Sequence, residues 1–305
     1  MNSGIEDMSK GAALPSTLRE RVRYFFAKQG HEKVTSLCGR INRIFRWAPV
    51  PVRLPLGFWW LAHDDHVSNP LREGWFERAE TAFVSRFLKP GMRVLDVGAH
   101  HGLYTVLASK RVSPGGRIVA FEPSPRERKA LRWHLRLNHC WNVRVNALAL
   151  GDEEKDVLLY LASDKETGCN SLRPPNVTGG AAPIRVHVTR LDDWMARNGG
   201  GSVDFIKLDV EGGELSVLRG AERFLEKRPR PVILAEVQEI RTAPWGYRAK
   251  EIIQHLARKD YQWFSLAEDG ALSKLDVDAQ EFDGNFVAWP KERSDGPHSE
   301  SQKPC

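Results

Sequence analysis

Short apolar strands alternate with amphipathic helices over most of the chain. The first clear strand is Arg93–Val97, a short apolar run that follows Pro90-Gly91. A turn bracketed by Gly98 and Gly102 then leads into Leu103–Lys110, which has the composition of a helix. A strand, a glycine turn and a helix in this order let the backbone approach a nucleotide-like ligand closely.

The alternation continues toward the carboxyl terminus and predicts a doubly wound, mostly parallel α/β sheet. The further strands that it predicts are Arg117–Phe121, Val143–Leu150, Val203–Leu208, Pro231–Val237, Tyr261–Leu266 and Asn285–Trp289. The predicted helices are Glu73–Leu88, Pro125–Asn138, Leu191–Asn198 with Thr189 and Asp192 as its capping pair, Glu214–Lys227 and Tyr247–Lys259.

One segment, Gly151–Val188, interrupts the alternation. It holds two strand-like runs, Val157–Leu161 and Ile184–Val188, with a polar loop and a flexible stretch, Pro174–Pro183, between them. Because it follows the third strand, we expect it to stand above the carboxyl edge of the sheet. Loops at that edge usually shape a substrate pocket, so we expect this insertion to form the acceptor site.

The chain has 305 residues and a net charge of +6, and this charge is unevenly placed. Residues 1–60 hold ten Lys or Arg against four Asp or Glu, whereas the remaining charges cancel. We therefore predict a basic extension over residues 1–72, partly helical, then a neutral catalytic domain over residues 73–290. Within the extension, Thr17–Trp47 has a basic amphipathic pattern that suits packing on the domain, an anionic membrane or nucleic acid. The proline-rich Pro49–Pro55 is expected to break the chain.

Several classes of protein are disfavoured by the composition. Four widely spaced cysteines form no Cys-x-x-Cys pair, so neither a zinc site nor a disulfide framework is indicated. The start of the chain lacks a secretory pattern, and the longest apolar stretch, Leu54–Ala62, is far shorter than the roughly 20 residues of a membrane span. These features predict a cytoplasmic protein, with a polar, mobile tail at residues 291–305.

Two acidic residues indicate the kind of ligand. Asp96 precedes the glycine turn in the pattern Asp96-x-Gly98-x-x-x-Gly102, which differs from the Gly-x-Gly-x-x-Gly of dinucleotide sites. A carboxylate here suits a ligand that carries an ammonium or a sulfonium, as S-adenosylmethionine does. Glu122 ends the next strand, about 20 residues after the turn, where an acid accepts hydrogen bonds from ribose hydroxyls. A capping Asp and a solvated Glu are the structural alternatives.

A second cluster of ionisable residues follows the strand Val203–Leu208. Lys207, Asp209 and Glu211 alternate along an extended stretch and are predicted to project to one side, beside the cofactor site. Ionisable groups in a cleft are costly unless they are paired or used in chemistry. The alternative is structural: a salt-bridged Lys207, with Glu211 capping the following helix.

These motifs resemble those of the FkbM-type methyltransferases. The resemblance runs from about Glu73 to Pro290 and rests on Asp96-Val-Gly-Ala-x-x-Gly102, Phe121-Glu-Pro-Ser124, Thr189-x-Leu-Asp-Asp193, Phe205-Ile-Lys-Leu-Asp-Val-Glu-Gly-x-Glu214 and Leu218-x-Gly-Ala221. It implies a class I methyltransferase fold, S-adenosylmethionine as cofactor and O-methylation of hydroxyls on sugars, glycolipids or secondary metabolites. It also implies a cofactor site that includes Asp96, Gly98, Ala99, His100, Gly102, Thr105, Glu122, Pro123 and Ser124. One position departs from the family, because His100 stands where Asn is usual.

The leading hypothesis is therefore an S-adenosylmethionine-dependent O-methyltransferase that acts on a small molecule or glycan. Asp209 or Glu211 is the preferred base, and Lys207 orients them or holds the acceptor. No set of ligands in the sequence requires a metal, but the binding of a divalent cation by these carboxylates is an open alternative. A nucleic-acid methyltransferase suits the basic front but not the neutral body, so no nucleic acid is expected as partner. A non-catalytic module that keeps the fold is the third hypothesis.

Overall fold

The structure is a computed structural model that describes residues 50–62, 67–175, 177, 179–294 and 296. The chain divides into two units, Met1–Val50 and Pro51–Cys305, and only Val50 of the first unit is described. The predicted helix over Thr17–Trp47 lies outside the described residues. Among those that are described, no helix is both long and apolar enough to cross a membrane.

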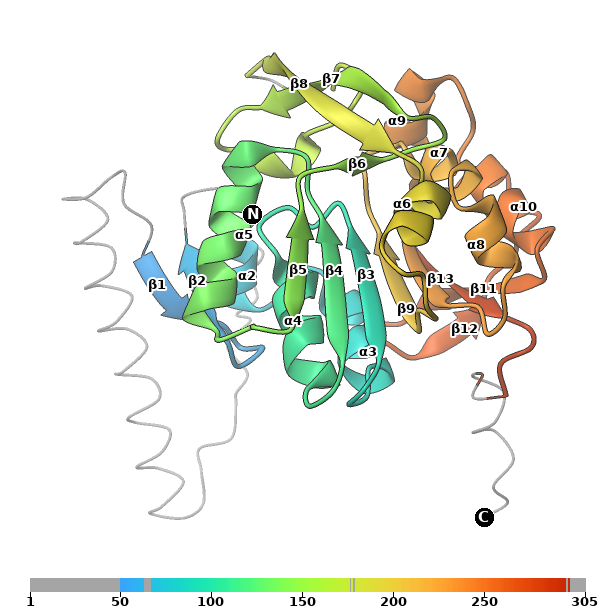
Figure 1. Cartoon of the computed structure of the whole chain (residues 1–305), viewed down its shortest axis with the longest axis horizontal. Coiled ribbons are helices and arrows are strands. Elements are labelled where there is room, and N and C mark those ends of the chain that lie inside the picture. Colours follow the sequence, from blue (N-terminus) through green and yellow to red (C-terminus); the bar gives the residue numbers. More distant parts are fainter. Residues whose placement is uncertain (1–49, 63–66, 176, 178, 295, 297–305) are drawn as a thin grey trace, which may run out of the picture. The chain divides into compact units, whose positions relative to one another are not determined.

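Eight strands of the described residues form the central sheet (Figure 1). They are β3 (Arg93–Val97), β4 (Arg117–Phe121), β5 (Val143–Asn146), β9 (Phe205–Leu208), β10 (Val232–Gln238), β11 (Tyr261–Leu266), β12 (Leu272–Lys274) and β13 (Asp283–Pro290). Their order across the sheet is β12-β11-β13-β10-β9-β3-β4-β5. The run from β10 to β5 is parallel, and β13 enters antiparallel to both β10 and β11. This is the doubly wound α/β fold that the sequence pattern predicts.

Helices cover both faces of the sheet because successive side chains of each strand point to opposite faces. Val94 and Phe205 belong to one apolar core, and their neighbours Leu95 and Ile206 belong to the other. The first core takes in α3 (Arg78–Phe87), α4 (Leu103–Val112) and α5 (Pro125–Leu137). The second takes in α6 (Leu191–Arg197), α7 (Glu214–Arg219), α8 (Glu222–Glu226) and α10 (Lys250–Ala257).

Above the carboxyl ends of the parallel strands lies a second, three-stranded sheet (Figure 1). It consists of β6 (Ala149–Leu150), β7 (Lys155–Ala162) and β8 (Ala181–Thr189), in the order β6-β8-β7. β7 and β8 form an antiparallel pair along their whole length. This places the segment Gly151–Val188 where the sequence predicts it. The stretch Pro174–Pro183 was expected to be flexible, but β8 begins within it, at Ala181.

Two predicted helices differ from the structure at a glycine. The expected Glu73–Leu88 begins later, as α3 at Arg78, because Gly74, at a φ of 83°, ends a separate helix that was not predicted, α2 (Ser68–Glu73). The expected Glu214–Lys227 is two helices, α7 and α8, separated at Gly220. A Cβ at Gly220 would lie 1.8 Å from the carbonyl oxygen of Gly151, so the break lets the chain pass directly beneath the insertion.

Three further local predictions are wrong. The run Val143–Leu150 is two strands in different sheets, β5 and β6. No side chain caps α6, whose N-cap is Arg190; the Asp192 carboxylate instead accepts from the backbone N–H groups of Arg223 and Phe224. The proline-rich stretch does not simply break the chain, because β1 (Val50–Arg53) forms there and pairs with β2 (Trp59–Ala62).

The boundaries at 72 and 290 cut through packed structure. Leu54, Phe58, Trp60 and Leu71 already belong to the first core. The Trp60 indole is fully buried and stacks on His134 of α5, with ring centroids 3.7 Å apart. Beyond the last strand, Glu292 forms an ion pair of 2.6 Å with Arg230. The domain boundaries stay a prediction, but residues on the far side of both are tied into the core.

Candidate active site

A cavity of about 360 Å³ lies at the carboxyl ends of the central parallel strands. Its wall combines the turn after β3, the ends of β4 and β10, the loop after β9 and the insertion. Parallel sheets bind ligands at this edge because the loops that leave each strand converge there. The cavity has a cofactor side around Glu122 and an acidic side around Asp209.

The glycine turn after β3 lets the ends of two strands approach each other closely. Gly98 has a φ of 86°, and a Cβ there would lie 1.7 Å from the carbonyl oxygen of Asp209. The backbone N–H groups of Gly98 and Ala99 both donate to the carbonyl of Phe121, at 3.1 and 3.0 Å. Only glycine fits at position 98, because both the backbone conformation and the close approach exclude a side chain.

Glu122 presents a buried carboxylate to the cavity. Its two oxygens accept from the backbone N–H groups of His100 and Ser124, each at 2.8 Å. Burial raises the pKa of this carboxyl to about 7, although the two backbone hydrogen bonds oppose the shift. A carboxylate has about four acceptor sites, so Glu122 can still accept from two ligand hydroxyls.

The other predicted cofactor residues divide into two groups. Of these, His100 and Pro123 line the cavity together with Gly98 and Glu122. The other group does not line the cavity and lies behind the turn instead. It consists of Asp96, Ala99, Gly102, Thr105 and Ser124. Direct contact between these five residues and a cofactor stays a prediction.

Asp96 shows what this support consists of. It is 2% exposed, and its carboxylate accepts a short hydrogen bond from the Thr105 hydroxyl in the first turn of α4. Burial raises the pKa of Asp96 to about 6 against the effect of that bond. Behind the turn, Ser124 caps α5 by accepting from the N–H of Glu127 at 3.4 Å. These contacts fix the turn that carries Gly98 and His100.

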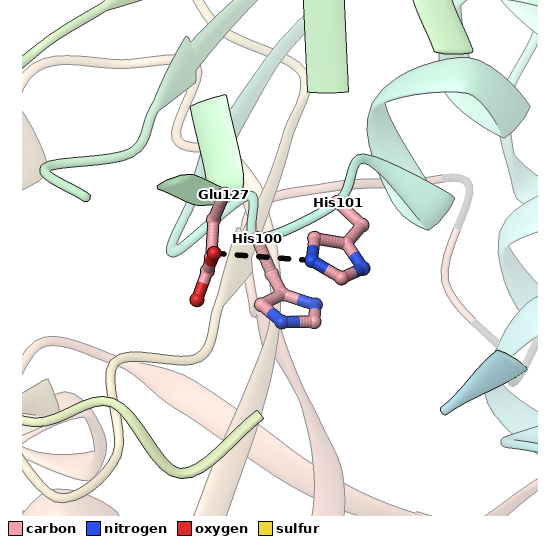
Figure 2. Close-up of side chains that lie close together, drawn as sticks. All are labelled: His100, His101 and Glu127. Atoms are coloured by element: carbon pink, nitrogen blue, oxygen red, sulfur yellow. Dashed lines mark ion pairs between the residues drawn. The ribbon is translucent and has the colours of Figure 1, made fainter. Parts of the chain in front are cut away.

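His100 belongs to a compact cluster with His101 and Glu127 (Figure 2). The two imidazole rings stack with centroids 3.9 Å apart, and His101 Nε2 lies 3.9 Å from Glu127 Oε2. The donor atoms of these three residues lie within 4.8 Å of one another, which is a spacing that a metal ion could draw together. The Glu127 carboxylate, however, already pairs with Arg126 at 2.7 Å, so the protein itself neutralises this charge.

On the acidic side, Lys207 pairs with Asp209 as a buried anchor. Lys207 Nζ is 2.9 Å from Asp209 Oδ2 and donates to Asn285 Oδ1 at 3.3 Å. The ammonium also lies 5.0 Å from the ring centroid of Tyr104. Burial alone would lower the pKa of Lys207, but the Asp209 and Glu77 carboxylates raise it above its ordinary value. Lys207 is therefore a permanent cation that holds Asp209 at the cavity wall.

Glu211 does not continue the row of Lys207 and Asp209 on an extended strand. The strand ends at Leu208, and Glu211 has a φ of 57°, so its carboxylate turns away and pairs with Arg241 at 2.9 Å. Glu211 does not cap the next helix either; Glu214 accepts from the N–H groups of Val210 and Gly212. Glu211 still lines the cavity, and burial raises its pKa well above the ordinary value.

Two acids in the cavity wall were missed from the sequence. Glu236 stands one residue beyond the Ala235–Leu208 pair of β10 and β9, level with Asp209, and burial raises its pKa well above the ordinary value. Glu77 accepts from the Tyr104 hydroxyl at 2.5 Å, and burial raises its pKa to about 7. An acid inside the apolar run Val232–Val237 is a signal that could have identified Glu236.

The insertion closes the cavity from above. Leu159 on β7 and the short helix Thr167–Cys169 contribute to the wall. Asn170 fixes this loop, because its side chain donates to Glu127 at 2.6 Å and accepts from the N–H of Ala162 at 2.9 Å. Arg126 adds a bond to the carbonyl of Ala162 at 2.9 Å. The start of α5 therefore holds both the cofactor side and the roof.

The fold and this site define a class of protein. The Gly98 turn that lines the cavity and the buried acceptor at Glu122 suit a nucleoside, and the neighbouring carboxylates suit a cationic centre. These are the requirements of S-adenosylmethionine, so the residues present fit that cofactor. The class is that of the S-adenosylmethionine-dependent methyltransferases.

Comparison with known proteins gives the family. Residues 96–263, more than half of the chain, match the methyltransferase FkbM domain, and the chain belongs to the FkbM methyltransferase family. It is 30% identical to the 31-O-demethyl-FK506 methyltransferase FkbM of Streptomyces tacrolimicus, over 50% of this chain and 68% of that protein. It is 27% identical to the AMB antimetabolite synthetase AmbE of Pseudomonas aeruginosa, over 62% of this chain.

Coverage of these relatives is incomplete, since the chain spans 10% of AmbE and about two thirds of FkbM. Among solved structures, the methyltransferase FkbM of Methylobacillus flagellatus is 18% identical, with a TM-score of 0.43 over 75% of this chain and 56% of that one.

Proposed function

We propose that this methyltransferase transfers the methyl group to a hydroxyl of an uncharged, polyhydroxylated acceptor such as a sugar. The observation that carries the proposal is the cavity itself, which presents the cofactor acid Glu122 and the carboxylates of Asp209 and Glu236 within one wall. O-Methylation needs this combination, because the acceptor must lose a proton while it is held beside the cofactor.

The charge of the acidic side favours a neutral acceptor. Four carboxyl groups, those of Glu77, Asp209, Glu211 and Glu236, line the cavity, whereas Lys207 and Arg241 are each already paired with one of them. Among the residues that the structure describes, no Lys or Arg other than Arg241 lines the cavity. The exposed Arg173, which lies over the Trp245 ring, is outside this lining, so a neutral acceptor suits the cavity better than an anionic one. Hydroxyl groups can both donate to a carboxylate and accept from a protonated carboxyl, so a polyol suits this surface.

Trp245 adds an apolar platform to the same wall. Its indole lies against the Gly212–Gly213 turn, and a Cβ at Gly213 would be 3.0 Å from the ring. Its Nε1 donates to the carbonyl of Glu211 at 3.3 Å, which fixes the ring. An aromatic face beside carboxylates is suited to a ligand with apolar C–H faces and hydroxyl edges.

The protein has three tasks in the reaction. When bound, S-adenosylmethionine supplies a methyl group that its sulfonium has already activated. Gly98 and Glu122 would hold the nucleoside part of this cofactor, and Lys207 fixes Asp209 in the wall. Asp209 or Glu236 then receives the hydroxyl proton of the acceptor, a contribution of roughly 10²–10⁴-fold to the rate. Glu211 was also a candidate base, and like Asp209 it is ion-paired; this proposal places Asp209 ahead of it because the Asp209 side chain is 25% exposed, against 14% for Glu211.

Methyl labelling of an extract tests the proposal. Purified protein is incubated with methyl-labelled S-adenosylmethionine and fractionated cell extract, and the labelled molecule is identified by mass spectrometry. We expect an O-methyl ether on an uncharged, hydroxyl-rich acceptor. A label on a nucleobase would favour a nucleic-acid methyltransferase, and no cofactor binding at all would favour a non-catalytic module; either result contradicts the proposal.

A further inference from the structure

A second hollow lies at the opposite edge of the same sheet, where the parallel strands begin. This groove, of about 860 Å³, is lined by the first residues of β3 and β4, by Arg144 of β5 and by the loop after α6. Arg93, Arg117, Arg144, Trp141 and Trp194 are the residues that give it its character. The active-site cavity is at the far end of the strands, about 13 Å away by the rise of a five-residue strand.

The positions of the three arginines bring like charges together, which destabilises the fold. Arg93 and Arg117 are direct partners in the pairing of β3 with β4, and all three side chains are exposed. Like charges opposite one another in a sheet are destabilising. Among the residues that the structure describes, no Asp or Glu forms an ion pair with any of the three guanidinium groups, and none lines the groove. Asp204 accepts from the backbone N–H of Arg93 at 2.8 Å.

Two tryptophans accompany these charges. Arg144 lies over the indole of Trp194, with its guanidinium carbon 5.4 Å from the ring centroid, and Trp194 is 7% exposed. Trp141 is 75% exposed, the largest exposure among the large apolar side chains described. One ring therefore supports an arginine, whereas the other, whose centroid lies 6.1 Å from that of the His139 ring, is largely exposed at the groove.

A run of three glycines completes the rim. Gly201 has a φ of 113°, and a Cβ there would lie 2.5 Å from Nη1 of Arg93. Glycine thus lets the Arg93 guanidinium lie directly on the loop backbone. Gly200 lines the groove without any atom crowding its Cβ position, so this part of the loop is open to a ligand.

We propose that this groove binds the phosphodiester backbone of single-stranded nucleic acid. Arg93 and Arg117 are direct partners on adjacent strands, whereas Arg144 of the third strand is the partner of Val119 and so lies two residues further along. This staggered set spreads positive charge along the groove, which suits a repeating row of phosphates better than one phosphate group. An exposed indole beside a basic groove suits stacking of a base, and such stacking is independent of sequence. Bound phosphates would also relieve the repulsion between Arg93 and Arg117.

The proposal does not depend on the proposed acceptor. The groove and the cavity lie at opposite ends of β3, so a strand held in the groove is not thereby presented to Asp209 or Glu122. Binding here would place the enzyme on a nucleic acid while the acidic cavity acts on another molecule. Loss of methyl transfer and loss of strand binding are therefore separate results.

Fluorescence anisotropy of a labelled 12-nucleotide oligouridylate, titrated with the full-length protein at several salt concentrations, tests the proposal. The variant Arg117→Gln/Arg144→Gln should bind at least about tenfold more weakly at low salt. Its salt dependence should also be shallower by about 1.4 in the slope of log affinity against log salt, since each phosphate contact in a single strand contributes about 0.7. Trp141→Ala should weaken binding without changing that slope.

Arg185→Gln is the matched control, because Arg185 is an exposed arginine on β8, away from the groove. It removes one positive charge, half of what the double variant removes, and should leave the affinity within about twofold. Equal binding by the wild type and the double variant would overturn the proposal, because the basic amino-terminal residues would then account for the affinity. Binding to phosphatidylglycerol vesicles that the double variant loses, with no binding to the oligouridylate, would overturn it in favour of a membrane surface.

Discussion

At the residue scale, Glu122 is the group whose chemistry the structure specifies most closely. Its pKa of about 7, raised by burial, means that the carboxylate form becomes dominant only as the pH rises through neutrality. Only the ionised form accepts from two ribose hydroxyls at once. We therefore expect S-adenosylmethionine to bind roughly tenfold or more weakly at pH 5.5 than at pH 8, as measured by calorimetry.

The variant Glu122→Gln isolates this effect. The glutamine keeps one acceptor oxygen for the turn but cannot ionise. The affinity of the variant for S-adenosylmethionine should therefore be lower than that of the wild type at pH 8, and it should change little between pH 5.5 and pH 8. If the wild type and the variant show the same pH dependence, another group controls cofactor binding and the role of Glu122 is wrong.

At the same scale, the sequence predicted which residues would lie at the site better than what they would contact. Glu122 and Asp209 could be located from strand ends alone, because each follows an apolar run. Glu211 lines the same cavity as Asp209, but its ion pair with Arg241 was not predicted, because a backbone φ of 57° after Val210 cannot be read from alternation. Glu77 enters from a turn before α3, where no local pattern signals a distant cavity.

At the scale of elements, the turn after β3 packs so closely against the chain after β9 that only glycine fits at position 98. Gly98→Ala should lower the free energy of unfolding by at least about 2 kcal/mol more than Gly91→Ala, in denaturant titrations. Both glycines have nearly the same φ, 86° and 88°, but a Cβ at Gly91 meets nothing within 4 Å, whereas one at Gly98 meets the Asp209 carbonyl. The difference between the two variants measures the contact, since backbone strain cancels. Equal losses would mean that the turn can move away from β9 freely.

Elements of the parallel sheet were the most predictable part of the fold. β3, β4 and β11 begin and end where the sequence places them, because each is a short, mostly apolar segment bounded by turns. The β1–β2 pair and the division of β5 from β6 depend on tertiary contacts: Trp59 exchanges two hydrogen bonds with Asn138, and β6 leaves the main sheet to pair with β8. Local pattern carries no information about such partners.

At the scale of the whole molecule, the buried carboxyl groups predict how stability depends on pH. Burial raises the pKa of Glu77, Glu122 and Glu214 to about 7 and that of Asp96 to about 6. Between the ordinary pKa values and these, the folded state binds more protons than the unfolded state. Stability should therefore fall as the pH rises from 5 to 7.5, and thermal unfolding without cofactor should show a lower midpoint at pH 7.5 than at pH 5.5.

Groups with lowered pKa values act in the opposite sense. Burial lowers the pKa of His255, which costs stability as the pH falls below 6.5. Hydrogen bonds from arginine lower the pKa of Glu292 to about 2 and lower that of Glu154, and both shifts matter only below about pH 4.5. The carboxyl groups with raised pKa values, to which Glu211 and Glu236 also belong, outnumber His255 in the window from pH 5 to 7.5. A midpoint that rises steadily across that window would show that the carboxyl groups are not protonated in the folded protein.

The most direct test of the account is the rate of methyl transfer by Asp209→Asn and Glu236→Gln, measured with the acceptor found by labelling and with cofactor affinity measured in parallel. Both changes keep the shape of the side chain and remove its charge, so packing alters little. We predict that at least one variant is slower by a hundredfold or more while its affinity for S-adenosylmethionine stays within about threefold. Turnover within a few-fold of the wild type in both variants would contradict the account, because the acidic side of the cavity would then be structural and the base would lie elsewhere.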